Sequence, residues 1–166
     1  MNAEQAMMRM ISISGHNRHD IAHFVKVYAY AGMIGRAEGL DAQTQNTLEL
    51  CAIVHDIACP LCRQKYGNTA GYHQEAESEA LLREFFAGTD VQGEQLERII
   101  RTVCRHHTYT GVTDIVHRIL LEADYLVNAD EHGDDTDKIR KAGNAFFATR
   151  YGSELLKQIY GTDSVD

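Results

Sequence analysis

Proline, tryptophan and long apolar runs are scarce in this sequence. Its 166 residues include one proline and no tryptophan, and no stretch alternates apolar and polar side chains for long. Few chain breakers and no period of two argue against a protein of many short strands and turns. No run approaches the ~18 apolar residues of a membrane-spanning helix, so we expect no membrane partner. These absences favour an all-α fold.

The four cysteines do not resemble the disulfide framework of a small secreted protein. Cys51, Cys59, Cys62 and Cys104 lie in a chain long enough to bury a core without crosslinks. The N-terminus, MNAEQAMMRM, lacks the apolar core of a signal peptide, so we expect a cytoplasmic protein with reduced thiols. Cys59 and Cys62 form a CxxC pair. Zinc would need two further ligands and a redox pair would need a βαβ unit, so we interpret them as loop thiols.

Positive charge is also in short supply. The net charge is −8, and no basic stripe balances it. This argues against a nucleic-acid polymer as the partner. A small anionic substrate stays open, because a metal ion and a few local cations can outweigh the field of the whole protein.

Apolar periodicity predicts a compact single-domain bundle of about seven to eight helices that spans residues 1–166. We expect helices at residues 3–13, 18–38, 41–55, 73–86, 93–105, 113–129, 134–147 and 152–160. Residues 57–72, with the only proline and two glycines, are expected to form an ordered loop at the mouth of the site. The acidic cluster at 130–137 is interpreted as a solvated loop and helix start.

The segment LELCAIVHD, residues 48–56, carries the first functional signal. Leu48, Cys51, Ala52 and His55 recur at i, i+3, i+4 and i+7, which places them on one helix face directed at the core. Burying His55 together with Asp56 would cost several kcal/mol without a partner. A divalent cation would satisfy both the imidazole and the carboxylate. The simpler alternative is a helix end with a capped or exposed pair.

Further candidate ligands lie on other predicted helices. His23 follows His19 by four residues, and Asp124 lies at i+4 from Leu120, on or beside a buried stripe. A pair of histidines, His106 and His107, ends the helix predicted at 93–105. A buried carboxylate such as Asp124 needs a partner.

A histidine, a His-Asp doublet and a distant aspartate on separate helices resemble the HD-domain metal-dependent phosphohydrolase superfamily. The matching segments are HDIAHFVKV around His23, AIVHDIA around the doublet and LLEADYLVN around Asp124, so the resemblance spans residues 18 to 130. It implies that His23, His55, Asp56 and Asp124 bind one metal, and that metal-activated water attacks a phosphorus centre. Some members hold a second metal with extra histidines, to which the segments at His73 and at His106-His107 are similar.

The resemblance implies an enzyme that hydrolyses small-molecule phosphoesters, with nucleotides as the substrate class. Mixed nitrogen and oxygen ligands suit Mn, Fe, Co, Ni or Zn better than Mg, and one ion or two would fit. The predicted roles are metal and water orientation for Asp56, phosphate polarisation for His106 or His107, and general acid for His73. Arg63 and Lys65 are predicted to neutralise substrate phosphate. A homodimer is left open.

One departure keeps two other functions open. Many members have HDxGK, and this chain has Cys59 in place of the lysine. A non-catalytic domain that binds or senses a metal and a nucleotide is the main alternative. A di-iron oxygenase is the weaker one, since it would need His73 and one histidine of the 106–107 pair as ligands.

Each histidine also has an ordinary structural interpretation. His23 alone could be a core histidine bonded to a carbonyl, and the 106–107 pair could interact with a helix dipole. His73 could be a surface residue at a helix start. We expect His16 and His19 at the rim of the site, and His117 and His132 in solvent.

Overall fold

A computed structural model describes residues 1–161, which contain nine helices and no strand. The predicted all-α fold is therefore confirmed. The helices are α1 (Ala3–Ile13), α2 (Arg18–Ala37), α3 (Ala42–Val54), α4 (Cys59–Tyr66), α5 (Gly71–Phe86), α6 (Gly93–Val103), α7 (Ile115–His132), α8 (Thr136–Phe146) and α9 (Arg150–Tyr160). None of these helices is long and apolar enough to span a membrane.

Helices α2, α3 and α7 pack against one another at the centre of the molecule. The predicted inward face of α3 is confirmed, because Leu48, Cys51, Ala52 and His55 are all fully buried. Helices α2 and α3 approach closely at Gly35, where an added Cβ would lie 2.7 Å from Leu48 Cδ2. A larger residue would push the two helices apart.

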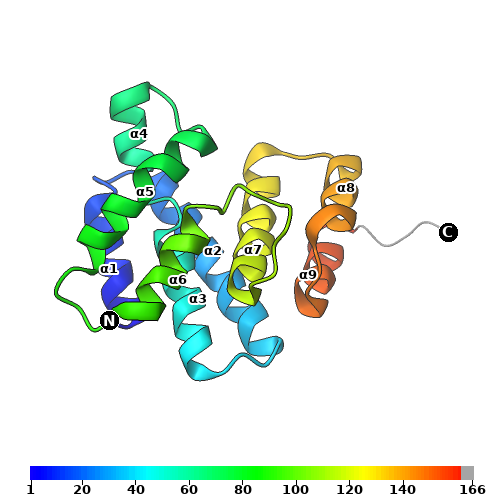
Figure 1. The fold of residues 1–166 in the computed structure, drawn as a ribbon. Helices are drawn as coiled ribbons and strands as arrows, with labels where there is room; N and C mark the ends of the chain where they lie inside the picture. Colours follow the sequence, from blue (N-terminus) through cyan, green and yellow to red (C-terminus); the bar gives the residue numbers. More distant parts are fainter. Residues whose placement is uncertain (162–166) are drawn as a thin grey trace.

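The remaining helices pack around this centre. Helix α1 contacts α3, α5 packs against α6, and α8 and α9 pack against each other. Figure 1 shows α8 and α9 at one end of the molecule and α1, α4 and α5 at the other. Helices α1 and α9 add Ala3, Ala6, Met10 and Leu156 to the same hydrophobic core. The single-domain arrangement of residues 1–166 stays a prediction.

Side-chain caps set where several helices begin. Asn17 Oδ1 accepts hydrogen bonds from the backbone of His19 and Asp20, and Asp41 caps α3 in the same way. Each cap satisfies amides that have no partner within the helix. These two caps set where α2 and α3 begin, and therefore the helix phase that turns His23 and His55 inward.

The loop predicted at 57–72 is wrong over half of its length, because residues 59–66 form α4. Pro60 lies in the first turn of this helix, where its missing N–H costs nothing and its fixed φ favours the helix. Gly67 ends α4 with φ of 71°, and α5 begins at Gly71, two residues earlier than predicted. Only 57–58 and 67–70 of this stretch lie outside helices.

Candidate metal centre and cavity

Four side chains direct ligand atoms into one buried space. His23 Nε2 lies 3.2 Å from His55 Nε2 and 3.2 Å from Asp124 Oδ1. Asp56 Oδ2 lies 3.6 Å from both imidazole nitrogens, and His55 Nε2 lies 3.6 Å from Asp124 Oδ1. The structure thus brings together all four residues predicted as metal ligands. They come from α2, from the end of α3 with the residue that follows it, and from α7.

The outer ring nitrogens show how these imidazoles are oriented. His23 Nδ1 donates to Glu131 Oε2 at 2.9 Å, and His55 Nδ1 donates to the Ala52 carbonyl at 2.8 Å. His106 Nδ1 donates to the Val103 carbonyl at 2.7 Å. When Nδ1 carries the proton, neutral imidazole presents a lone pair on Nε2. Metal-binding histidines are typically oriented in this way.

The donor set fits one divalent cation. Ligand atoms bound at about 2.1 Å from a single ion lie roughly 3.0–3.5 Å apart, close to the separations seen here. The Nε2 of His106 is also buried, has no hydrogen-bond partner within residues 1–161, and lies 3.7 Å from Asp56 Oδ1. Buried lone pairs that face carboxylates need a positive charge between them. His23, His55 and Asp56 also meet the spacing expected of a metal site.

The pKa shifts of His23, Asp56 and Asp124 also indicate a site that favours a bound positive charge. Burial lowers the pKa of His23, but the hydrogen bond to Asp124 and the charges of Asp56 and Asp124 raise it to about 9. Burial raises the pKa of Asp56 and Asp124, but the neighbouring histidines hold both carboxyls well below their usual pKa range. The centre therefore stabilises positive charge, which a proton on His23 or a cation can supply.

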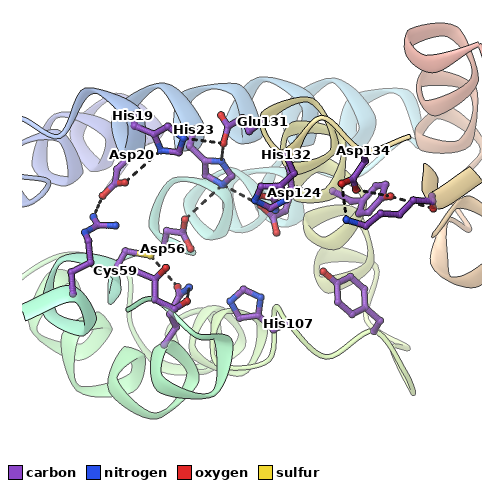
Figure 2. Close-up of a pocket in the computed structure, with 17 residues that line it drawn as sticks. His19, Asp20, His23, Asp56, Cys59, His107, Asp124, Glu131, His132 and Asp134 are labelled. Carbon is purple, nitrogen blue, oxygen red and sulfur yellow. Dashed lines mark hydrogen bonds and ion pairs between the residues drawn. The ribbon is translucent and has the colours of Figure 1, made fainter. Parts of the chain in front are cut away.

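A cavity of about 530 Å³ opens over these ligands and connects them to solvent. Figure 2 shows His23, Asp56 and Asp124 directed into it, with His107 and Cys59 on its walls. The Asp56 side chain is 23% exposed, whereas His55 is fully buried. The volume lies within the usual range for a small-molecule site.

A comparison with protein-family models matches residues 20–129 to the family described as HD domain. The chain belongs to the HD domain family. This match confirms the superfamily expected from the motifs, and it covers every predicted ligand. No curated protein and no solved structure matches the chain.

Of the five remaining predicted site residues of this HD domain, two line the cavity and three do not. His106, predicted with His107 to polarise the phosphate, is fully buried beside Asp56 and does not line it. Arg63 lines the cavity and pairs with Asp20 on α2, and His107 lines it from the end of α6. Lys65 instead pairs with Glu77, and the His73 ring stacks on Tyr66 with centroids 3.7 Å apart. Neither lines the cavity, because α4 and α5 turn these side chains toward each other.

The other histidines of the chain, His16, His19, His117 and His132, divide between solvent and core. His16, His19 and His132 are exposed, and the last two line the cavity. His117 was expected in solvent, but it is buried and its Nε2 donates to the Arg105 carbonyl at 2.9 Å. His117 is buried because it lies on the side of α7 that is directed toward the end of α6.

His107 has an environment of its own. Its Nε2 is buried without a hydrogen-bond partner in the described chain. Burial and the nearby charge of His106 lower the pKa of His107 to about 4. An added Cβ on Gly71 would lie 2.7 Å from the His107 ring, so this glycine permits the start of α5 to pass beside the imidazole. His107 therefore presents a neutral ring to the cavity at neutral pH.

Several cavity residues were not identified from the sequence. Glu131, which orients His23, and Asp134 belong to the acidic cluster that we interpreted as solvated. That interpretation is wrong for these two residues, because α7 extends to His132 and carries Glu131 over the metal centre. The others are Asp20, Thr69, Gln74, Tyr109, Tyr125, Asn128 and Lys138. The sequence signal for Glu131 is its spacing of seven from Asp124, which puts both on one face of α7.

Proposed function

We propose that this HD domain is a metal-dependent hydrolase of small-molecule phosphoesters, with nucleotides as its substrates. The observation that carries the proposal is the convergence of His23, His55, Asp56 and Asp124 on one point at the floor of a cavity. A bound divalent ion would lower the pKa of water and polarise a phosphoryl oxygen there.

The residues that would hold the ion have different exposure. His23, His55 and Asp124 are buried, so they are positioned by packing and by hydrogen bonds to their outer atoms. Asn128 Nδ2 donates to Asp124 Oδ1 at 2.9 Å, the same oxygen that faces His23 and His55, so this hydrogen bond helps to orient it. Asp56 lines the cavity and is partly exposed, so of the four residues it is the one most accessible to a bound substrate.

Two cations from different helices line the cavity and could neutralise a phosphate. Arg63 on α4 pairs with Asp20, and Lys138 on α8 donates to Asp134 at 2.6 Å. Arg63 retains further N–H donors in this pairing, and guanidinium groups bind phosphate oxygens in pairs. Lys138 replaces Lys65 as the second candidate, because Lys65 does not reach the cavity.

His107 replaces His73 as the candidate for proton exchange with the substrate. It lines the cavity, whereas His73 is stacked on Tyr66. With its pKa near 4, the His107 imidazole is neutral at pH 7 and would act first as a proton acceptor or neutral hydrogen-bond donor.

Aromatic walls support nucleotides as the substrate class. Tyr109 and Tyr125 line the cavity, and both pack against Phe146 with ring centroids 4.6 and 5.3 Å away. Rings braced in this way offer faces on which a base can stack. The cavity volume of about 530 Å³ would accommodate a nucleoside monophosphate.

The test is turnover with defined metals. Metal-free protein would be reconstituted with Mn, Co, Ni, Zn or Mg and assayed on a chromogenic phosphoester and on nucleoside monophosphates. We expect at least one metal to support hydrolysis, with activity reduced by roughly 100-fold or more in His55→Ala and Asp124→Ala. The matched control is Asp137→Ala, an exposed carboxylate on α8 outside the cavity.

Metal content measured on the same samples by mass spectrometry completes the test. Near-stoichiometric metal that both ligand variants lose supports the centre. Bound metal without turnover on any substrate would contradict the hydrolase and leave a domain that binds or senses its ligand. The alternative has one observation in its favour: Cys59 lines the cavity where many family members have lysine, and its Sγ donates to Gln74 Oε1 at 3.3 Å.

The di-iron alternative is weakened by the position of His73. It required His73 and a histidine of the 106–107 pair as ligands, and the His73 ring is stacked on Tyr66 outside the cavity. A measured stoichiometry of two metals per chain would support the di-iron alternative again. His106 and His107 would then be the candidate nitrogen ligands near Asp56.

A further inference from the structure

A second cavity, of about 310 Å³, lies between α6 and the start of α7. One side carries Arg98, Arg101 and Arg105 from α6 and the turn after it. The other side is the 111–114 loop and the first turn of α7. Its volume is at the lower end of the range for ligand pockets, which suits an occupant the size of one or two phosphate groups.

The positive charge of this cavity opposes the charge of the whole protein. The protein carries a net charge of −8, yet three arginines line this space and Asp114 is the only acid among the lining residues. Arg98, Arg101 and Arg105 are spaced i, i+3 and i+7, so they project from one side of the helix. Like charges at such spacings destabilise a helix unless something binds to them.

Contacts within the described chain leave most of this charge available. Arg98 donates to both oxygens of Asp114 at 2.8 and 3.0 Å, and Arg101 donates to Glu94 at 2.6 Å. Arg105 makes no side-chain hydrogen bond or ion pair within residues 1–161. Each guanidinium has five N–H groups, so only three N–H groups of the trio are used.

Asp114 does not cancel the cavity's affinity for anions, because its charge is already compensated. It accepts the backbone N–H of Val116 at 2.7 Å as the N-cap of α7, in addition to the two bonds from Arg98. In the adjacent loop, the backbone amides of residues 110–113 have no acceptor within the described chain. The arginines and three residues of this loop, Gly111, Val112 and Thr113, line one concave space.

We propose that this cavity binds the phosphate or diphosphate group of a small phosphorylated compound, at a site separate from the metal centre. Guanidinium groups match phosphate oxygens in pairs, which an isolated lysine does not. The site is also connected to the metal centre by the chain. The Arg105 carbonyl accepts a hydrogen bond from His117, and the next residue is His106. A ligand on Arg105 would therefore contact the turn that positions His106 and His107.

Calorimetry with inorganic diphosphate tests the proposal. The full-length protein would be titrated without metal, in the presence of a chelator and at constant ionic strength, so that the metal centre does not contribute. We expect one diphosphate per chain, and Arg101→Ala/Arg105→Ala should weaken binding at least tenfold. Both positions are exposed and alanine favours helix, so this variant should fold. The single variant Arg105→Ala removes no hydrogen bond or ion pair seen within residues 1–161 and should show part of the loss.

Two control variants distinguish binding at this cavity from a general effect of positive charge and from binding in the larger cavity. Lys141→Ala/Lys157→Ala also removes two exposed cations from helices, and it should bind diphosphate within about twofold of wild type. Arg63→Ala, in the larger cavity, should do the same. The proposal is overturned if wild type does not bind, if the double arginine variant binds as wild type does, or if either control loses affinity equally.

Discussion

His23 is the residue at which the chemistry of this protein can be examined first. Its Nε2 lies among two carboxylates and a second imidazole, and its Nδ1 donates to Glu131. The carboxylates raise its pKa to about 9 despite burial. Below that pH a proton supplies the positive charge that the surrounding carboxylates require. A metal ion must displace this proton to use the same nitrogen.

Metal affinity should therefore depend on pH. Below about pH 9 metal-free His23 is protonated, so binding releases a proton and the apparent Kd should fall about tenfold per pH unit as pH rises from about 6 to 8.5. Calorimetric titration with Ni²⁺ in buffers of different ionisation enthalpy would count the protons released. A Kd that stays constant across this range would show that His23 is not a ligand.

A substitution at Glu131 tests how far metal binding depends on residues that hydrogen-bond to the proposed ligands. Its carboxylate accepts from His23 Nδ1 and, at 3.0 Å, from Lys26 Nζ. In Glu131→Ala we expect metal affinity to fall about 10–100-fold, because the His23 ring loses its orienting partner. Asp130→Ala is the matched control, since that side chain is 74% exposed and does not contact His23. Equal losses in both variants would point to general electrostatics instead.

The sequence predicts the four ligands better than the groups that support them. His55, Asp56 and Asp124 follow from local rules, since each is a polar residue on or beside an apolar helix face. Glu131 reaches His23 across a separation of 108 residues, and no local pattern encodes that contact. The sequence likewise does not show that Lys65 and His73 lie away from the cavity, because that depends on how α4 is oriented in the fold.

Helix α4 shows why one helix could not be predicted from the sequence. Its eight residues are too few to give a clear apolar period, and Pro60 and Gly67 are equally typical of a loop. Isolated helices of this length are unstable in water, so contacts with α5 decide the outcome. The longer helices, from α1 to α3 and from α5 to α9, were predictable because each has enough turns to show a buried face.

The connection between α8 and α9 depends on one buried residue of α7. Glu122 Oε1 accepts from the backbone amides of Ala148 and Thr149 at 2.7 and 2.9 Å, and its Oε2 accepts from the Thr149 hydroxyl. These bonds hold the connection between α8 and α9 against α7. Helix α8 carries Lys138, which lines the cavity, and Phe146, which packs against the cavity residue Tyr109. A remote residue thus supports one wall of the site.

Glu122→Ala should destabilise the protein by about 2–4 kcal/mol, because two backbone donors lose their acceptor in a buried place. Glu122→Gln should cost less than about 1 kcal/mol, since its amide oxygen can still accept from both amides and burial already raises the pKa of this carboxyl. Urea unfolding followed by circular dichroism gives both values. Glu154→Ala, on the exposed side of α9, is the control and should change stability by at most about 0.5 kcal/mol. A Glu122→Ala cost no larger than this control would contradict the role.

At the scale of the whole molecule, the candidate metal centre joins elements that are far apart in the sequence. The four proposed ligands come from α2, from the end of α3 with the residue after it, and from α7, which pack together as the centre of the fold. Helices α1, α8 and α9 lie outside the family match at 20–129, but α1 and α9 add residues to the same core. Metal binding and folding should therefore be coupled.

Metal should raise the stability of the folded protein by an amount that its affinity sets. An ion that binds only the folded chain adds about 2.7 kcal/mol at a concentration 100-fold above Kd. For a domain of this size that corresponds to a rise in Tm of roughly 5–10 °C. Scanning calorimetry with and without a chelator measures the shift, and Asp124→Ala should show none. If titration shows tight binding but Tm does not move, the ion binds the unfolded chain equally well. Four ligands assembled only by the packing of α2, α3 and α7 would not permit that result.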